Sequence, residues 1–195
     1  NTNNGTVNGA TLTSDRFGNA NSAYAFDGVD DYISFPSGSS SSLNILGDFS
    51  LSLWFKSSQD VCQIISFGDQ LSGSGGYLFG LGQAYNDFGA ITVYVQSPWR
   101  STVQPYNQNL YYHSVLTLKS DTLSLYINDV LSFQWYGHSA LSWNGNRFLG
   151  KSANTASTDY NGIADDIGIW NRALTQCEIS ALYHSQQLTP PVVSL

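Results

Sequence analysis

Apolar and polar residues alternate in short segments along the chain, and a period of two is typical of half-buried β-strands. In residues 49–56 (FSLSLWFK), the apolar side chains of Phe49, Leu51, Leu53 and Phe55 fall on one face. The same alternation occurs in residues 91–95, 113–119 and 122–127. Gly, Asn and Asp residues separate these segments, with no helical pattern between them. The sequence therefore predicts an all-β protein, a two-sheet antiparallel β-sandwich or jelly roll.

One pair of predicted strands is joined by a short turn. Residues 122–127 (TLSLYI) and 130–135 (VLSFQW) are separated by Asn128 and Asp129 alone. Asn and Asp tolerate the positive φ that a two-residue hairpin turn requires. The two segments are therefore expected to form a β-hairpin.

A single short helix is predicted near the C-terminal end of the chain. Thr175 and Glu178 stand three residues apart, which is the spacing of a capping box at a helix start. Ile179, Leu182 and Tyr183 then form an apolar stripe at helical spacing. Because Glu178 is the only Glu in the chain, this pattern gives that residue a structural role.

The length suits one domain, which we place at residues 1–187. Residues 188–195 contain adjacent prolines, which stop a helix, and are expected to form a C-terminal linker. The chain begins at Asn1 and shows no signal peptide, as expected for an excised part of a larger secreted or cell-surface protein. No apolar run approaches the ~20 residues of a membrane helix, so membrane insertion is not expected.

The charge of the chain narrows the range of partners. Only 11% of the 195 residues are charged, the formal net charge is -7 and the pI is about 4.5. The seven basic residues are scattered along the chain, whereas a nucleic-acid site needs clustered Lys and Arg. We therefore expect no nucleic-acid partner, and the same balance disfavours anionic membranes and highly sulfated polymers.

The acidic residues do not form a catalytic pattern. With Glu178 as the only Glu among 14 acidic residues, a pair of catalytic Glu is impossible. Asp165 and Asp166 are adjacent, so on a strand they point to opposite faces and cannot act together on one bond. No Gly-x-Ser-x-Gly motif is present, and neither Cys lies in a nucleophile motif. The sequence therefore predicts a protein that is not an enzyme.

The two cysteines, Cys62 and Cys177, lack the close spacing of a metal site. In an exported chain they are compatible with one disulfide, and they are equally compatible with two free thiols. The sequence leaves both alternatives open.

Several segments together resemble a known family. Residues 17–35 contain Gly-Asn-Ala, then an aromatic-x-Phe-Asp-Gly pattern and Asp-Tyr-Ile. Residues 49–56 follow, and residues 162–183 contain the Asn-Arg-Ala-Leu turn before the predicted helix. Residues 111–131 are similar to the family's middle hairpin. The chain is similar to the laminin G-like (LamG, three-type) family of the concanavalin A-like lectin/glucanase superfamily, in nearly its whole length and in the same order.

The resemblance implies two antiparallel sheets packed face to face, in agreement with the alternation, whereas function follows less directly because this fold serves many functions. Many relatives hold a structural calcium ion where the first and last strands meet. By analogy, Asp27 and Asp165 would be side-chain ligands, with Gly18 and Asn21 nearby. The alternative is that these Asp residues cap turns, as in Asp27–Gly28.

Aromatic residues beside polar residues in loops are candidates for a sugar site, because aromatic faces stack on sugar C–H groups while amides bind hydroxyls. The alternative for each aromatic residue is packing at the end of the core. An arginine also matches the carboxylate of a uronic or sialic sugar. The candidate ligand-binding residues are Tyr85, Asn86, Trp99, Arg100, Trp135, Tyr136, Trp143 and Asn144.

The sequence thus predicts a non-catalytic, lectin-like carbohydrate-binding module with a structural calcium ion, whose partner is a polysaccharide or glycoconjugate. We expect it on a secreted or cell-surface protein beside other domains, where a weak single site gains through multivalency. An adhesion or spacer module that binds protein, or no specific ligand, is the alternative. A polysaccharide hydrolase or lyase is the third interpretation.

Overall fold

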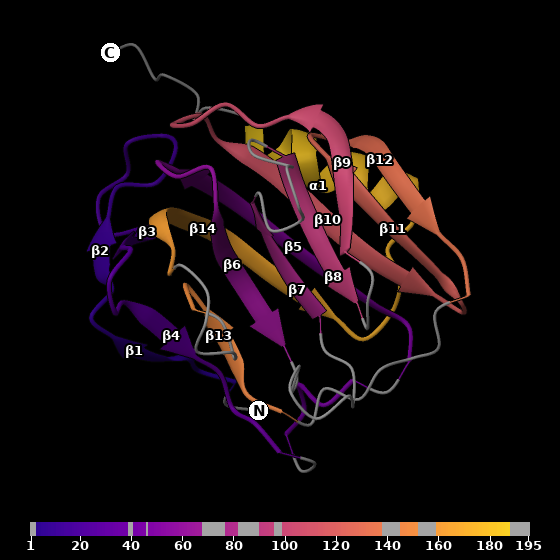
Figure 1. Cartoon of the computed structure of the whole chain (residues 1–195), viewed down its shortest axis with the longest axis horizontal. Coiled ribbons are helices and arrows are strands. Elements are labelled where there is room, and N and C mark those ends of the chain that lie inside the picture. The colour runs from indigo at the N-terminus through magenta and orange to yellow at the C-terminus, as the bar shows by residue number, and fades with distance from the viewer. Residues whose placement is uncertain are drawn as a thin grey trace, which may run out of the picture.

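The computed structural model describes residues 3–38, 41–45, 47–67, 77–81, 90–95, 99–137, 145–151 and 159–187. For strand residues 77–78, 94–95 and 99–105 the backbone alone is described. The described part forms two seven-stranded sheets stacked face to face and one helix, α1 (Gln176–Gln187) (Figure 1). All strand pairs are antiparallel. The predicted all-β sandwich with one short helix is confirmed.

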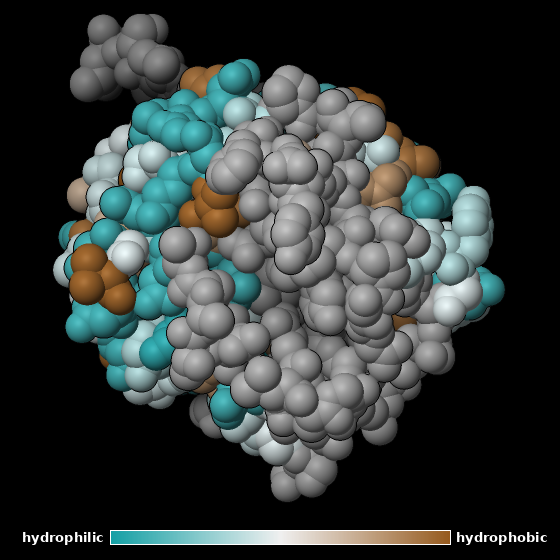
Figure 2. Space-filling model, in the orientation of Figure 1, coloured by the Kyte–Doolittle hydropathy of each residue, from teal (hydrophilic) through white to brown (hydrophobic). Residues whose placement is uncertain are grey.

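The first sheet has the strand order β1-β4-β13-β6-β7-β8-β9. Its outward face is turned toward the viewer in Figure 2, where the coloured atoms are mainly hydrophilic and the hydrophobic ones lie in small separate groups. Small apolar groups of this kind are ordinary on a folded surface. The strands are β1 (Thr6–Asn8), β4 (Tyr32–Ser34), β13 (Arg147–Leu149), β6 (Cys62–Phe67), β7 (Tyr77–Leu81), β8 (Ala90–Val95) and β9 (Trp99–Pro105).

The second sheet has the order β12-β11-β10-β5-β14-β3-β2, with β5 paired to both β10 and β14. Helix α1 packs on the face of this sheet that is turned away from the core, because Tyr183 stacks on Trp54 and Trp54 alternates with the core residue Leu53. The strands are β12 (Val130–Trp135), β11 (Thr122–Ile127), β10 (Tyr112–Lys119), β5 (Phe49–Ser57), β14 (Asn161–Trp170), β3 (Ala23–Asp27) and β2 (Thr11–Thr13).

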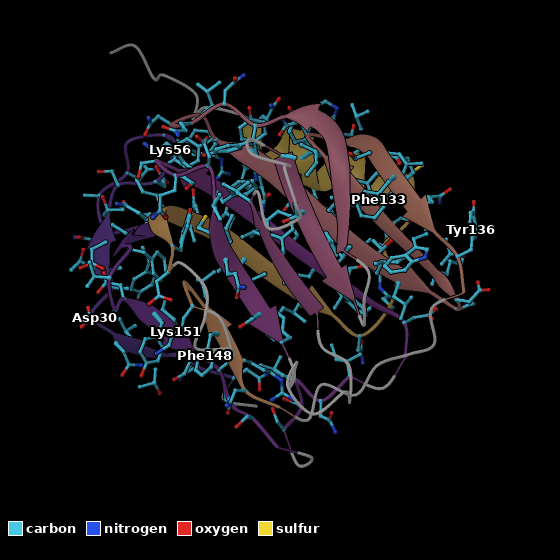
Figure 3. All side chains as sticks on the ribbon, in the orientation of Figure 1. Asp30, Lys56, Phe133, Tyr136, Phe148 and Lys151 are labelled. Atoms are coloured by element: carbon cyan, nitrogen blue, oxygen red, sulfur yellow. The ribbon has the colours of Figure 1, made fainter. Side chains whose placement is uncertain are left out.

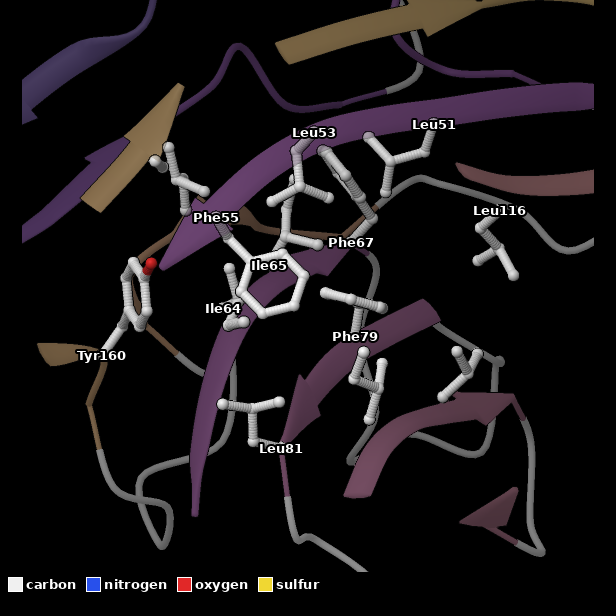
Figure 4. Packing of buried hydrophobic residues seen from close by; sticks show 14 of the residues in the cluster. Leu51, Leu53, Phe55, Ile64, Ile65, Phe67, Phe79, Leu81, Leu116 and Tyr160 are labelled. Atoms are coloured by element: carbon white, nitrogen blue, oxygen red, sulfur yellow. The ribbon is translucent and has the colours of Figure 1, made fainter. Parts of the chain in front are cut away.

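The hydrophobic core lies between the two sheets and uses alternate residues of facing strands (Figure 4). Leu51, Leu53 and Phe55 of β5 are at most 2% exposed. The ring of Phe55 meets Phe79 of β7 edge to face, with 5.4 Å between ring centroids. These contacts hold the two sheets together and determine which face of each strand points away from the core.

The predicted hairpin is confirmed by β11 and β12, which coincide with the two predicted segments. Asn128 and Asp129 have φ of 50° and 68°, the left-handed values of a type I′ turn. Asn128 Oδ1 also accepts a hydrogen bond of 2.9 Å from the His113 N–H. The turn is therefore held to the neighbouring strand β10 as well as by its own geometry.

The predicted capping box is present at the start of α1. The Glu178 N–H donates to Thr175 Oγ1 at 3.3 Å, and the Thr175 N–H donates to Glu178 Oε2 at 2.8 Å. Arg172 also donates to both carboxylate oxygens of Glu178, and these hydrogen bonds lower the pKa of Glu178 to about 2. The only Glu of the chain is thus engaged at the helix start. Within the described residues, no helix combines the length and apolar character needed to cross a membrane.

Both cysteines are free thiols. Cys62 is fully buried in the core, and burial raises the pKa of its thiol to about 12. Cys177 is exposed on α1. Because the two residues lie in the core and on the outer helix, the disulfide alternative left open by the sequence is not formed.

Candidate functional site

An open groove of about 600 Å³ lies on the outer face of the second sheet. Its floor comes from β10, β11 and β12, and its wall is the segment 173–176 that leads into α1. Helix α1 covers the neighbouring part of this face over Trp54 and His113. The groove is therefore the part of the outer face that the helix leaves open.

The alternation of β11 explains why the floor is polar. Leu123, Leu125 and Ile127 point into the core, so Ser124 and Tyr126 point to the outer face. Tyr126 is half-buried, and burial raises the pKa of its phenol. The hydroxyl therefore stays protonated at neutral pH and serves as both donor and acceptor.

A chain of hydrogen bonds runs along the floor from β11 to the end of β12. Gln134 Nε2 donates to Ser124 Oγ at 3.1 Å, and the Tyr136 hydroxyl donates to Gln134 Oε1 at 3.3 Å. Tyr136 is 66% exposed and lies at the margin of the molecule, just beyond β12 (Figure 3). The floor thus combines an exposed aromatic ring with an amide and hydroxyls, the groups that contact both the apolar faces and the hydroxyls of sugars.

The wall is held in place by contacts with the sheet and the hairpin. The Leu174 N–H donates to Ser50 Oγ at 2.8 Å, which ties the segment to β5. Gln176 Nε2 donates to Asp129 Oδ1 at 2.9 Å, and Ser180 Oγ donates to the same oxygen at 2.7 Å. The groove is therefore bounded by elements that the surrounding structure keeps in position before any ligand arrives.

The structure separates the two neighbouring aromatic residues that were predicted to bind ligand. Tyr136 lines the groove. Trp135 instead lies on the opposite side of β12, packed against the core and paired with Leu123. Adjacent residues of a strand point to opposite faces, so only one of the two can reach the groove.

The other predicted ligand-binding residues fall into two groups, one on the first sheet and one outside the described residues. Trp99 and Arg100 lie on β9 of the first sheet, and only their backbone is described. The remaining four predicted residues lie outside the described residues, and they are Tyr85, Asn86, Trp143 and Asn144.

Sequence reasoning missed Ser124, Tyr126 and the wall at 173–176 as groove residues. The polar side of the β11 alternation was a signal for the first two. The wall had no such signal, because its position depends on how α1 docks on the sheet.

The predicted calcium ligands are not brought together. Strands β3 and β14 are neighbours as expected, but Asp27 pairs with Asn161. Asp165 lies four residues further along β14, which is about 13 Å at the rise of a strand, and is bound by Arg16 at 2.5 Å. Gly18 hydrogen-bonds Asp15 within its own turn. The predicted pairing of Asp27 with Asp165 is therefore wrong, because the strand register keeps the two carboxylates apart.

Asn21, the remaining predicted ligand, has a φ of 59° in the turn before β3. Asp27 instead forms an acidic group with Asp30 and Asp31, whose carboxylate oxygens lie within 4.8 Å of one another. Asp27 Oδ1 accepts from the Val29 N–H at 2.8 Å, so this residue also caps its turn. Clustered carboxylates are chemically suited to calcium, and the ion stays a prediction.

Calcium removal separates the two interpretations of this acidic group. If Asp27, Asp30 and Asp31 hold calcium, excess chelator lowers the Tm, because an ion that binds only the folded state stabilises it. Asp30→Asn removes one of the three carboxylates, so we expect the chelator no longer to lower the Tm of this variant. Because Asp30 is exposed, the substitution itself leaves the turn intact. Differential scanning calorimetry with and without chelator measures the shift. An equal Tm in both conditions would leave turn capping as the role of these residues.

Ser52 and His113 are the one serine–histidine pair at hydrogen-bond distance among the described residues, with 2.8 Å between Ser52 Oγ and His113 Nε2. Both residues are at most 1% exposed, and His113 Nδ1 has no hydrogen-bond partner. The rings of Trp54 and Tyr183 stack against the imidazole. A nucleophile–base pair needs access to substrate and a group that orients the base, so this arrangement serves packing.

Comparison with solved structures supports the observed architecture. The binding domain of Paraclostridial Mosquitocidal Protein 1 has a TM-score of 0.72 at 14% identity, with 94% of this chain and 48% of that chain covered. The botulinum neurotoxin serotype D ligand binding domain, in complex with N-acetylneuraminic acid, has a TM-score of 0.68 at 17% identity, covering 95% and 47%. The chain thus spans about half the length of these binding domains.

A third structure matches over most of both chains. Domain 4 of AbnA, a GH43 extracellular arabinanase from Geobacillus stearothermophilus, in complex with arabinotriose, has a TM-score of 0.65 at 21% identity, covering 89% of this chain and 87% of that chain. At these identities the likeness concerns the fold. No curated protein matches the chain in sequence. A family model described as the Concanavalin A-like lectin/glucanases superfamily matches residues 27–180, and the chain therefore belongs to the laminin G-like, three-type family of that superfamily.

Proposed function

We propose that the chain is a non-catalytic glycan-binding module and that the groove on the second sheet holds the glycan. The observation that carries the proposal is the combination of an exposed Tyr136 ring with the hydrogen-bonded pair Gln134 and Ser124 on one preformed surface. An aromatic ring stacks on the C–H face of a sugar, while amide and hydroxyl groups bind its hydroxyls. Tyr126 adds a second phenol to the same floor.

The structural neighbours support the class of ligand. Two of them were solved with arabinotriose and with N-acetylneuraminic acid, so this fold presents sugars in proteins otherwise unlike the chain. The proteins around those domains are an extracellular arabinanase and a neurotoxin. We accordingly place the chain in a secreted or cell-surface protein, beside other domains, with a polysaccharide or glycoconjugate as partner.

The absence of catalysis belongs to the proposal as well. Asp121 is the single carboxylate that lines the groove within the described part of the chain, whereas glycoside hydrolysis uses two carboxylates on either side of the bond. The mechanism is equilibrium binding in a groove that is formed in advance. A single groove of this kind binds weakly, and repeated copies on a polymer raise the overall affinity.

Glycan-array screening of the whole chain, with isothermal titration of the hits, tests the proposal. We expect at least one polysaccharide or oligosaccharide to bind, and Tyr136→Ala to weaken binding by about tenfold, since an aromatic contact contributes ~1.4 kcal/mol. Leu12→Ala is the control, because Leu12 is 53% exposed on β2, at the opposite edge of the sheet from the groove. Equal binding by both variants would show that the glycan site lies outside the groove. No binding to any glycan would favour an adhesion or spacer module.

A further inference from the structure

We infer that the groove selects neutral, hydroxyl-rich polysaccharides and rejects sugars that carry a carboxylate or sulfate. This inference rests on the proposed function and adds the class of substrate. It follows from the charges that line the groove, from the partners of the arginines and from the state of the helix start beside the wall.

The charged side chains of the groove balance each other. Of the described residues, Lys119 and Asp121 are the charged ones that line it, and both stand at the turn between β10 and β11. Asp48 adds a further negative charge at this turn, because its Oδ1 accepts from the Ser120 N–H at 2.7 Å. The chain as a whole carries -7. An anionic polymer therefore meets no net positive surface in the groove and a repulsive field outside it.

Among the residues that the structure describes, no arginine lines the groove, although a guanidinium is the group that best matches a carboxylate. Arg16 is engaged by Asp165 and Asp166 at 2.5 and 2.7 Å. Arg172 donates to both oxygens of Glu178, and Arg147 is 1% exposed. The arginine side chains that the structure describes are therefore committed to contacts within the protein.

The helix start beside the wall is already neutralised. A free helix N-terminus attracts anions through its unpaired N–H groups and its dipole. Here the carboxylate of Glu178 accepts from the Thr175 N–H, and Thr175 Oγ1 accepts from the Glu178 N–H. The protein supplies its own anion at this point, so the carboxylate of an acidic sugar gains little by binding there.

The remaining polar groups suit hydroxyls, which donate and accept at once. Ser124 Oγ accepts from Gln134 and keeps its own proton to donate. Gln134 keeps its second N–H, and the Tyr126 hydroxyl faces the same space. Neighbouring hydroxyls of a neutral sugar match this mixture of donors and acceptors, and the exposed Tyr136 ring matches its C–H face.

Titration calorimetry of the whole chain with matched neutral and acidic glycans tests the inference. The neutral panel is arabinan, xylan and mannan oligosaccharides, and the acidic panel is oligogalacturonate, alginate and sialyllactose. We expect neutral ligands to bind at least about tenfold more tightly, with less than about a twofold change between ~50 and ~500 mM salt, because no ion pair is formed. Leu12→Ala changes an exposed residue of β2 outside the groove and is expected to leave neutral binding unchanged, while Tyr136→Ala weakens it by about tenfold. Lys119→Gln tests whether any acidic binding depends on a charge in the groove.

Three other outcomes would contradict the selectivity for neutral glycans, the assignment of the groove or the proposed function. If acidic glycans bind as well as neutral ones, and if their binding weakens with salt and depends on Lys119, the inference is overturned. The groove would still be a glycan site. Acidic binding that Tyr136→Ala does not affect would overturn both the inference and the assignment of the groove. Failure of every glycan in both panels would overturn the proposed function itself.

Discussion

Arg16→Ala is expected to lower the free energy of unfolding by about 3 kcal/mol or more, because it leaves a buried carboxylate without its partner. Arg16 Nη1 lies 2.5 Å from Asp165 Oδ2, and the two side chains are 7% and 2% exposed. Its guanidinium also donates to the Gln186 carbonyl at 2.7 and 3.0 Å and lies 4.5 Å from the Trp54 ring centroid. One residue thus joins the N-terminal turn, β14 and the end of α1.

The burial of Asp165 is what makes this loss large. Burial, and then the charge of Asp166, raise the pKa of Asp165, although Arg16 opposes both. Urea denaturation of the wild type and Arg16→Ala measures the difference. Arg172→Ala is the matched control, because it breaks a bidentate pair with Glu178 that is exposed, and exposed pairs contribute little. Equal losses in the two variants would contradict a buried role for Arg16, and Arg16→Ala combined with Asp165→Asn is expected to recover part of the loss.

Acidification is expected to destabilise the protein through His113. Burial, followed by the positive charge of Arg16, lowers the pKa of this imidazole from 6.5 to about 4. Between these two values the unfolded chain binds a proton and the folded protein does not, so stability is lost as the pH falls through that window. The difference between the two pKa values corresponds to about 3 kcal/mol.

The free energy of unfolding at about pH 7 and about pH 4.5 measures this loss. His113→Gln removes the titrating group, and we expect it to flatten the pH dependence in this window while lowering stability at neutral pH through the lost stacking on Trp54. His184→Gln is the control, since its side chain is 68% exposed. If His113→Gln keeps the full acid sensitivity of the wild type, the loss of stability comes from other titrating groups.

The elements were predictable where local rules decide them. The Asn128–Asp129 turn and the Thr175–Glu178 cap depend on residues a few positions apart, and the structure has both as expected. Alternation along β5 and β11 was likewise enough to separate the core face from the outer face. From these patterns the sandwich follows without knowledge of the strand order.

The site was less predictable because it depends on contacts between distant segments. The open groove exists where α1 stops covering the second sheet, and the docking of that helix through Trp54 and Tyr183 is invisible in the local pattern. The proximity of β3 and β14 was foreseen, but not the register that pairs Asp27 with Asn161. Nor does any local signal reveal that Arg16 reaches Asp165, 149 positions away.

Nuclear magnetic resonance mapping of bound glycan distinguishes the groove from other surfaces, because it locates the site as well as detecting binding. The measurement is the change in backbone amide shifts when the neutral oligosaccharide of highest affinity is titrated into the chain. We expect the largest changes in the segments 117–126, 134–136 and 173–176, which contain the residues that line the groove. Changes concentrated instead in residues 32–34 and 147–149, on the first sheet, would contradict the assignment of the groove as the glycan site.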